Sequence, residues 1–109
     1  MKVMITGVYG LIAGALYKHL AQSPDTYDVY GLARRRQDSE RVADGEGVDV
    51  PEDKFTLSDM SDLDVLVKAF DGMDVVVHLA ADPSGQGGWE SVLKSNIVGA
   101  HNVLEACRL

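Results

Sequence analysis

The 109-residue chain has 17 acidic and 10 basic side chains, a formal net charge of −7, and 46% hydrophobic residues. This composition predicts one folded domain and excludes a disordered chain, and the dispersed acidic residues exclude a basic face for nucleic acid. The single Cys107 excludes an internal disulfide and favours a reducing cytoplasm. We expect neither a signal peptide nor a membrane span, since no apolar run reaches about 18 residues.

The predicted elements alternate between strand and helix. In chain order they are a strand at Lys2–Thr6, a helix at Leu11–Gln22, a strand at Tyr27–Ala33, a strand at Lys54–Leu57, a helix at Leu63–Phe70, a strand at Asp74–Ala80 and a helix from about Trp89 to Arg108. Ser61 or Asp62 can cap the second helix, and Gly72 ends it. We expect residues 34–51 to form a surface loop with at most a short helix. The fourth strand, continuously apolar, is predicted to be buried on both faces.

This alternation predicts an α/β fold, a doubly wound parallel sheet of Rossmann-like type with strand order 3-2-1-4. In such a sheet a cofactor lies beyond the carboxyl ends of the strands. Three segments are therefore expected to converge there: residues 7–12, 33–36 and 79–81.

The turn after the first strand has the spacing G-x-x-G-x-x-A. Gly7 permits a tight turn, Gly10 lets a pyrophosphate approach the main chain, and Ala13 suits a close contact between helix and sheet. The N–H groups and the positive end of the helix dipole would both face the phosphate. This pattern indicates a dinucleotide site; the alternative is a strand–helix turn that holds no ligand.

Three arginines, Arg34, Arg35 and Arg36, follow the second strand, where an acidic residue would favour NAD. Arginine pairs well with phosphate oxygens, so the sequence favours NADP over NAD. The alternative is that the arginines are solvated charges on an acidic protein. Asp38 lies further along and could still reach a ribose.

Two further polar residues are open to more than one interpretation. Asp59 could accept a hydrogen bond from an adenine amino group, with Met60 against the ring, or it could simply precede a helix. His78 lies within an apolar strand, where a packed histidine is more common than a catalytic one.

Four segments together resemble a known family. They are Thr6-Gly7-x-x-Gly10-x-x-Ala13, Ser58-Asp59-Met60-Ser61-Asp62, His78-Leu79-Ala80-Ala81 and the run from Asn96 to Ala106. In this order they resemble the extended short-chain dehydrogenases/reductases, the NAD(P)-dependent epimerase/dehydratase superfamily. Trp89-Glu90 and Leu104-Glu105-Ala106 look most similar to its uronate dehydrogenase branch, from whose NAD-type members the three arginines depart.

The resemblance implies a role for each matching position. The pyrophosphate would bind the turn made by Gly7, Tyr9, Gly10, Leu11 and Ile12. Arg34 and Arg35 would hold the 2′-phosphate or the adenosine ribose, Asp59 and Met60 the adenine, and Leu79, Ala80 and Ala81 the nicotinamide-side ribose. Asn96 would shape the central helix of the cofactor site, the alternative being a polar residue on a packed helix.

Members of the family carry a catalytic Tyr-x-x-x-Lys pair. None of the four tyrosines here is followed four places later by a lysine, so no catalytic or metal-binding residue is assigned. We therefore expect residues 1–109 to be the incomplete NAD(P)-binding domain of a sugar or sugar-nucleotide oxidoreductase or epimerase, inactive alone. The alternatives are a non-catalytic nucleotide-sensing module and a fragment that folds by assembly. An exposed edge on the fourth strand predicts a homo-oligomer.

Overall fold

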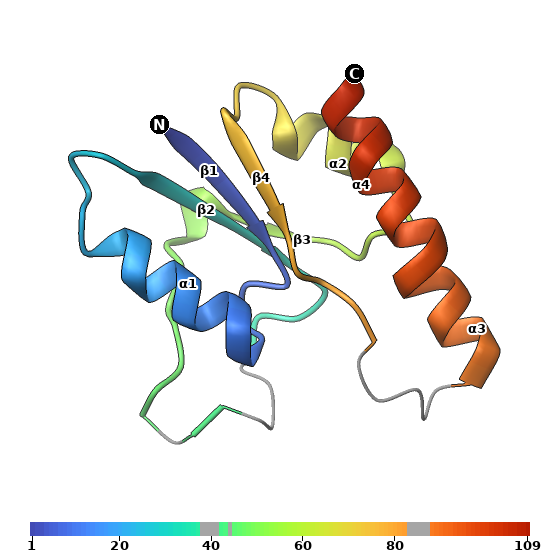
Figure 1. The fold of residues 1–109 in the computed structure, drawn as a ribbon, viewed down its shortest axis with the longest axis horizontal. Helices are drawn as coiled ribbons and strands as arrows, with labels where there is room; N and C mark the ends of the chain where they lie inside the picture. The colour runs from blue at the N-terminus through green and yellow to red at the C-terminus, as the bar shows by residue number, and fades with distance from the viewer. Residues whose placement is uncertain (38–41, 44, 83–87) are drawn as a thin grey trace.

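The computed structural model describes residues 1–37, 42–43, 45–82 and 88–109. Its strands are β1 (Lys2–Thr6), β2 (Asp28–Ala33), β3 (Phe55–Leu57) and β4 (Val75–His78), and its helices are α1 (Leu11–Ala21), α2 (Leu63–Phe70), α3 (Gly88–Val92) and α4 (Gly99–Arg108). A short 3₁₀ turn, η1 (Glu52–Lys54), precedes β3, and a π-helical segment, η2 (Leu93–Val98), joins α3 to α4. The strands form one parallel sheet of order β3-β2-β1-β4 (Figure 1). The predicted fold class and strand order are confirmed.

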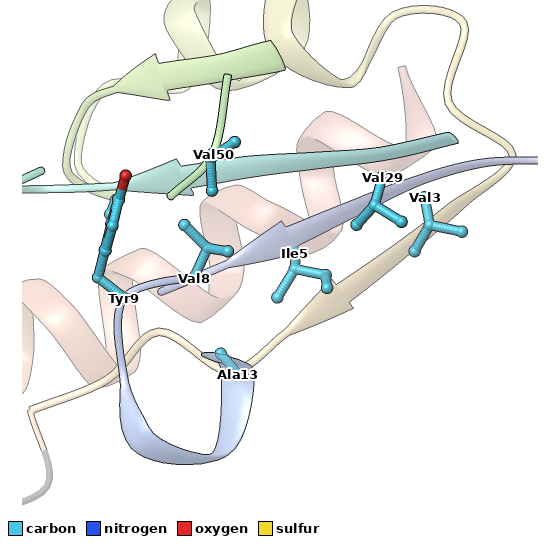
Figure 2. Packing of buried hydrophobic residues seen from close by; sticks show 8 residues of the cluster. Val3, Ile5, Val8, Tyr9, Ala13, Val29 and Val50 are labelled. Atoms are coloured by element: carbon cyan, nitrogen blue, oxygen red, sulfur yellow. The ribbon is translucent and has the colours of Figure 1, made fainter. Parts of the chain in front are cut away.

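Helices cover both faces of the sheet, α1 on one side and α2 with α4 on the other (Figure 1). Because side chains alternate along β1, Val3 and Ile5 pack toward α1 whereas Met4 packs toward α2 and α4. The core is therefore divided into two clusters by the sheet. Figure 2 shows the first cluster, in which Ala13 of α1 lies against the strands, as its place in the glycine pattern predicts.

The ends of α2 follow the predicted chemistry. Asp62 is the N-cap, and its Oδ1 accepts a hydrogen bond of 3.3 Å from the main-chain N–H of Val65. Gly72, with φ of +78°, adopts the left-handed conformation after the helix. The choice between Ser61 and Asp62 as the cap is thereby decided for Asp62.

The fourth strand differs from its prediction in length and in burial. β4 ends at His78, and Val75 is exposed while the rest of the strand is half-buried. Among the described residues β4 pairs only with β1, so one side of it is the edge of the sheet. An apolar run typical of a central strand is thus found at an edge, and the prediction of burial on both faces is wrong.

The last helix also differs from its prediction, since its middle turn is π-helical. A π turn is wider than an α turn and often marks a functional site. Here it carries Lys94 and Asn96, which contact the loops after β3 and β4, respectively. On a regular α-helix, residues two apart point in different directions. The π turn was not predicted because apolar periodicity gives no signal of such a local widening.

The described part of the segment between β2 and η1 contains no helix or strand. Asp38, which the sequence suggests as a ribose ligand, lies outside the described residues. Within the described ranges, no helix combines the length and apolarity needed to cross a membrane.

Replacing Leu66 with Ala should destabilise the fold by about 2–5 kcal/mol, because Leu66 is fully buried between α2, the sheet and α4. The matched change Leu104→Ala, at an α4 residue that is 72% exposed, should alter stability by less than about 0.5 kcal/mol. Urea unfolding with an unchanged m value measures both. Equal losses in the two variants would contradict this assignment of the core.

Candidate functional site

The carboxyl ends of β1, β2 and β3 are joined by main-chain hydrogen bonds. The N–H of Gly7 donates to the carbonyl of Leu32 at 2.7 Å, and the N–H of Ser58 donates to the carbonyl of Ala33 at 3.0 Å. Since all the strands are parallel, the loops that follow them begin at one edge of the sheet. The segments that follow β1 and β2, which the sequence predicts to converge, therefore begin close together.

Gly7 lies against the chain that follows β4. A methyl group on Gly7 would be 2.9 Å from Cα of Ala80 and 3.0 Å from its nitrogen, closer than a side chain tolerates. Gly7 also has φ of +69°, a left-handed conformation that favours glycine. Conformation and space thus both require glycine at the first position of the pattern.

A buried hydroxyl links the same two segments. Thr6 has no exposed surface, and its Oγ1 accepts hydrogen bonds from the N–H groups of Leu79 at 3.0 Å and Ala80 at 3.2 Å. The Nδ1 of His78 lies 2.8 Å from the same oxygen. Thr6 therefore holds the end of β4 beside the glycine turn.

The start of α1 provides main-chain donors. Gly10 precedes the helix and has no side chain to cap it, and no acidic residue occupies the first turn. The N–H groups of Leu11 and Ile12 have no acceptor within the helix, as in the first turn of any α-helix. These donors and the positive end of the dipole suit a negatively charged group.

Tyr9 does not present its side chain to this crevice. Its ring is 6% exposed and packs edge-on against Phe55, with ring centroids 5.6 Å apart. Figure 2 shows the ring among the core residues. Of this predicted cofactor residue, only the main chain is left to contact a ligand.

A cavity of about 250 Å³ brings together three of the predicted adenosine-side residues. Its wall is formed by Arg34, Asp59, Met60, Glu90, Ser91, Lys94 and Ser95. Gly10 and Leu11 instead border a separate cavity of about 130 Å³, which lies between α1 and the loop residues Val42, Glu46, Gly47 and Val48. The predicted site residues are therefore distributed over two hollows and the strand-end contacts, and they do not share one cavity.

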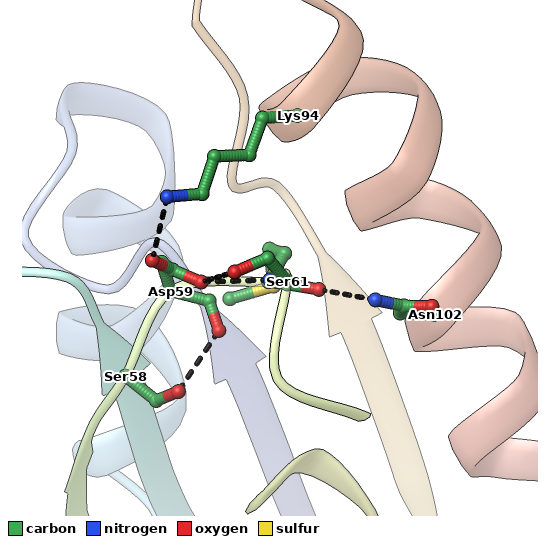
Figure 3. Close-up of polar contacts among 6 residues, drawn as sticks. Ser58, Asp59, Ser61, Lys94 and Asn102 are labelled. Carbon is green, nitrogen blue, oxygen red and sulfur yellow. Dashed lines mark hydrogen bonds and ion pairs between the residues drawn. The ribbon is translucent and has the colours of Figure 1, made fainter. Parts of the chain in front are cut away.

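Asp59 is surrounded by donors (Figure 3). Its Oδ1 accepts hydrogen bonds from the hydroxyl of Ser61 and from the N–H of Ser61, the latter at 2.7 Å, and its Oδ2 lies 3.3 Å from Nζ of Lys94. The hydrogen bonds from Ser61, followed by Lys94, lower the pKa of the Asp59 carboxyl group below its ordinary value. Asp59 is therefore an ionised acceptor, and an incoming adenine amino group would share Oδ2 with Lys94.

The helical segment from α3 to α4 also holds the loops after β3 and β4. Asn96 accepts a 2.7 Å bond from the N–H of Asp82 and donates a 3.1 Å bond to its carbonyl. Asn102, which is buried, donates a 2.9 Å bond to the carbonyl of Met60 (Figure 3). Asn96 is thus occupied in fixing main chain and is not part of the wall of the 250 Å³ cavity.

The three arginines after β2 separate. Arg36 turns back, donates to the carbonyl of Val50 and stacks over Phe55, with 5.3 Å between its Cζ and the ring centroid. Arg34 and Arg35 are exposed, but only Arg34 borders the cavity with Asp59. The structure therefore places one of the two predicted phosphate-binding arginines at the cavity.

Comparison with known proteins identifies the family. Residues 3–109 match the family described as NAD dependent epimerase/dehydratase. The chain belongs to this family. The resemblance expected from the glycine turn and the strand-end motifs is thereby confirmed.

Two curated relatives from Haloferax volcanii match nearly the whole of this epimerase/dehydratase chain. An L-arabinose 1-dehydrogenase (NAD(P)(+)) is 34% identical over 96% of the chain, and an NAD-dependent glucose-6-phosphate dehydrogenase is 32% identical over 95%. The chain spans only about a third of their length, 35% and 37% respectively. Their alignment therefore concerns the part of each relative that corresponds to residues 1–109.

Among solved structures, a uronate dehydrogenase from Agrobacterium tumefaciens, a Y136A mutant complexed with NAD, is similar to this chain with a TM-score of 0.76. The match covers 98% of this chain and 36% of the other, at 21% sequence identity. At that identity the similarity shows a shared fold.

Several residues at this edge of the sheet were not predicted from the sequence as site residues. Thr6 was overlooked because a threonine at the end of an apolar strand looks unremarkable in sequence, although a buried hydroxyl needs partners. Ser91, Lys94 and Ser95 border the cavity, and their spacing of three and four residues on a predicted helix could have indicated a common face.

Gly7→Ala should destabilise the domain by about 1–3 kcal/mol, because the added methyl group meets Ala80 in a left-handed backbone conformation. Gly14→Ala is the matched control: its methyl group makes ordinary contacts of 3.5 Å, and helix propensity favours alanine by up to about 1 kcal/mol. Urea unfolding and the amide resonance of Ala80 report the two effects. An unshifted Ala80 resonance in Gly7→Ala would contradict the proposed contact.

Proposed function

We propose that this chain binds a nicotinamide dinucleotide at the carboxyl edge of its sheet, as the cofactor-binding portion of a sugar or sugar-nucleotide oxidoreductase or epimerase. The observation that carries the proposal is the contact of Gly7 with Ala80 beside the uncapped start of α1. A close approach of two main-chain segments, N–H groups without an acceptor in the helix, and the positive end of the helix dipole occur together there. The family assignment and the dehydrogenase relatives support the same conclusion.

The residues present fit such a cofactor. The pyrophosphate would lie on the main chain from Gly7 to Ile12, with the donors at the start of α1 directed to its oxygens. Leu79, Ala80 and Ala81 would border the nicotinamide-side ribose. When bound, the nicotinamide ring supplies hydride transfer, and the residues of this chain hold and orient it.

The adenosine end would occupy the 250 Å³ cavity. Arg34 would pair with a 2′-phosphate, and Met60 would contact the adenine. Lys94 offsets the charge of Asp59 at 3.3 Å, so a phosphate near Arg34 meets a carboxylate that already has a cationic partner. We therefore propose that the site accepts both NAD and NADP and prefers NADP. The names of the two dehydrogenase relatives include both cofactors, which supports the first part of this proposal.

Catalysis would require residues outside positions 1–109. No tyrosine in this sequence is followed four places later by lysine, and the relatives are almost three times as long as the stretch they share with it. If the chain acts without such residues, it would be a nucleotide-sensing module instead. A cytoplasmic location and a homo-oligomer stay predictions from the sequence.

Arg34→Met should weaken NADP binding about tenfold and change NAD binding less than twofold, because a charge-assisted hydrogen bond to the 2′-phosphate is lost. Isothermal titration calorimetry with each dinucleotide measures this. Arg108→Met is the matched control, since Arg108 pairs with Glu105 on α4 and does not border the cavity. Equal weakening of NAD and NADP would contradict the 2′-phosphate role, and absence of binding by either would overturn the proposed function.

The cation opposite Arg34 provides a second test of the same cavity. Lys94→Met should also weaken NADP more than NAD, because the ionised Asp59 would then face the phosphate without its partner. Lys68→Met on the exposed face of α2 is the control. A Lys94 variant with unchanged affinity for both dinucleotides would remove Lys94 from the proposed site.

A further inference from the structure

The Thr6 hydroxyl has three hydrogen-bond partners, and only one arrangement of the hydrogen atoms satisfies all of them. Three nitrogen atoms lie within hydrogen-bond distance of Oγ1: the main-chain nitrogens of Leu79 and Ala80, at 3.0 and 3.2 Å, and Nδ1 of His78, at 2.8 Å. Thr6 has no exposed surface, so water does not reach it from outside. The direction of each hydrogen bond is therefore set by these groups alone.

Counting protons fixes the directions. A hydroxyl group has one hydrogen to donate and two lone pairs to accept with. The N–H groups of Leu79 and Ala80 can only donate, so they occupy both lone pairs. The remaining hydrogen of Thr6 must point to Nδ1 of His78, which accepts only when that nitrogen carries no proton. His78 is thus neutral and holds its proton on Nε2.

We infer that His78 is a positioning residue: it orients the Thr6 hydroxyl, so that Thr6 holds the main chain of Leu79 and Ala80 at the cofactor crevice. The inference rests on the proposed function, because that crevice is where the dinucleotide would bind. His78 does not itself need to touch a ligand. Its effect passes through Thr6 to Ala80, which contacts Gly7.

Protonation of His78 would break this arrangement. With a proton on Nδ1, three donors would face one oxygen that has two lone pairs, and the hydroxyl hydrogen would lose its acceptor. Either the imidazolium ring moves away or one of the bonds to Leu79 and Ala80 is lost. Both outcomes loosen the end of β4 next to the glycine turn, so dinucleotide affinity should fall at acid pH.

Among the described residues no ion pair involves His78, and burial is the cause that shifts its pKa. Strand alternation places His78 on the face covered by α2 and α4, whose ionisable side chains are Asp64, Lys68, His101, Glu105, Cys107 and Arg108. The α4 residues that are buried against this face are Gly99, Asn102, Val103 and Ala106, none of them ionisable. On β1 the ionisable residue is Lys2, at the opposite end of the strand.

Burial of His78 also favours its neutral form. Desolvation lowers the pKa of His78 below the 6.5 of free histidine. Because the unfolded chain then takes up the proton first as the pH falls, stability is full above about pH 6.5 and decreases as the pH falls through the folded-state pKa. The loss of affinity compares the free folded protein with the complex, so it should follow the folded-state pKa of His78 alone.

The tautomer can be tested on the chain without any nucleotide. In ¹⁵N-detected spectra at pH 7.5, His78 should show the neutral form protonated on Nε2. On acidification, the amide resonances of Leu79 and Ala80 should move with the titration of His78, whose pKa burial holds below the 6.5 of free histidine. A proton on Nδ1 at pH 7.5, or amide resonances that do not follow His78, would overturn the inference.

Two variants then connect the tautomer to binding. His78→Asn keeps an acceptor near the position of Nδ1 but cannot titrate, so it should bind NADP as the parent does at pH 7.5 and lose the acid-dependent decrease. His78→Leu removes the acceptor and should weaken binding about threefold to tenfold at every pH. His101→Leu, at an exposed histidine on α4, is the control and should retain the parent's pH profile.

The outcomes separate the inference from the proposed function. If no dinucleotide binds while the spectra show the Nε2 tautomer and the coupled amides, the proposed function fails and the positioning of β4 by His78 stands. If the Asn variant binds with the same pH dependence as the parent, the role of His78 in binding fails and the cofactor site stands.

Discussion

The bond between the Thr6 hydroxyl and the main chain after β4 is the interaction on which the crevice depends. Parallel pairing aligns β1 with β4 only as far as His78, and beyond that residue the ladder provides no further bond between the two strands. Thr6 continues the connection through its side chain to Leu79 and Ala80. Because Ala80 is held there, Gly7 must lack a side chain, and the turn into α1 follows from that restriction.

A second constraint comes from the helical segment that crosses the other face. Lys94, Asn96 and Asn102 contact Asp59, Asp82 and the carbonyl of Met60, respectively. Two of these contacts are hydrogen bonds to main chain, which place a loop whatever its side chains are. Lys94 and Asn96, two residues apart on the π turn η2, contact the loops after β3 and β4, respectively. The loops after β3 and β4 are therefore positioned from outside the sheet.

Much of the fold could be predicted from local pattern. The alternation of apolar runs predicted the sheet order, and Asp62 and Gly72 marked the ends of α2, because caps and turns depend on nearby residues. The edge position of β4 follows from the predicted strand order, but its partial exposure could not be predicted, since an apolar run does not reveal what covers its faces. The π turn was missed because it is defined by main-chain hydrogen bonds spanning five residues, a local widening that apolar periodicity does not reveal.

The candidate site, like the fold, could be predicted only in part. Gly7 and Ala13 were predicted from local geometry and are confirmed in their structural roles. Tyr9 was predicted as part of the pyrophosphate-binding turn, and its side chain packs against Phe55 in the core. Asp59 has a nearby partner in Ser61, but Lys94 is 35 residues from Asp59 and Ala80 is 74 residues from Thr6, and spacing along the chain cannot specify these long-range partners.

The separation of Thr6 from Ala80, 74 residues along the chain, has a consequence for how the site comes into being. The glycine turn is synthesised before β4, yet its partners follow β4 in the chain. Long-range contacts of this kind form late, since the entropy of closing the intervening chain must be overcome first. A nascent chain that has passed the turn but not yet β4 therefore has the glycine motif without Ala80 beside it, and the crevice cannot form until β4 joins β1.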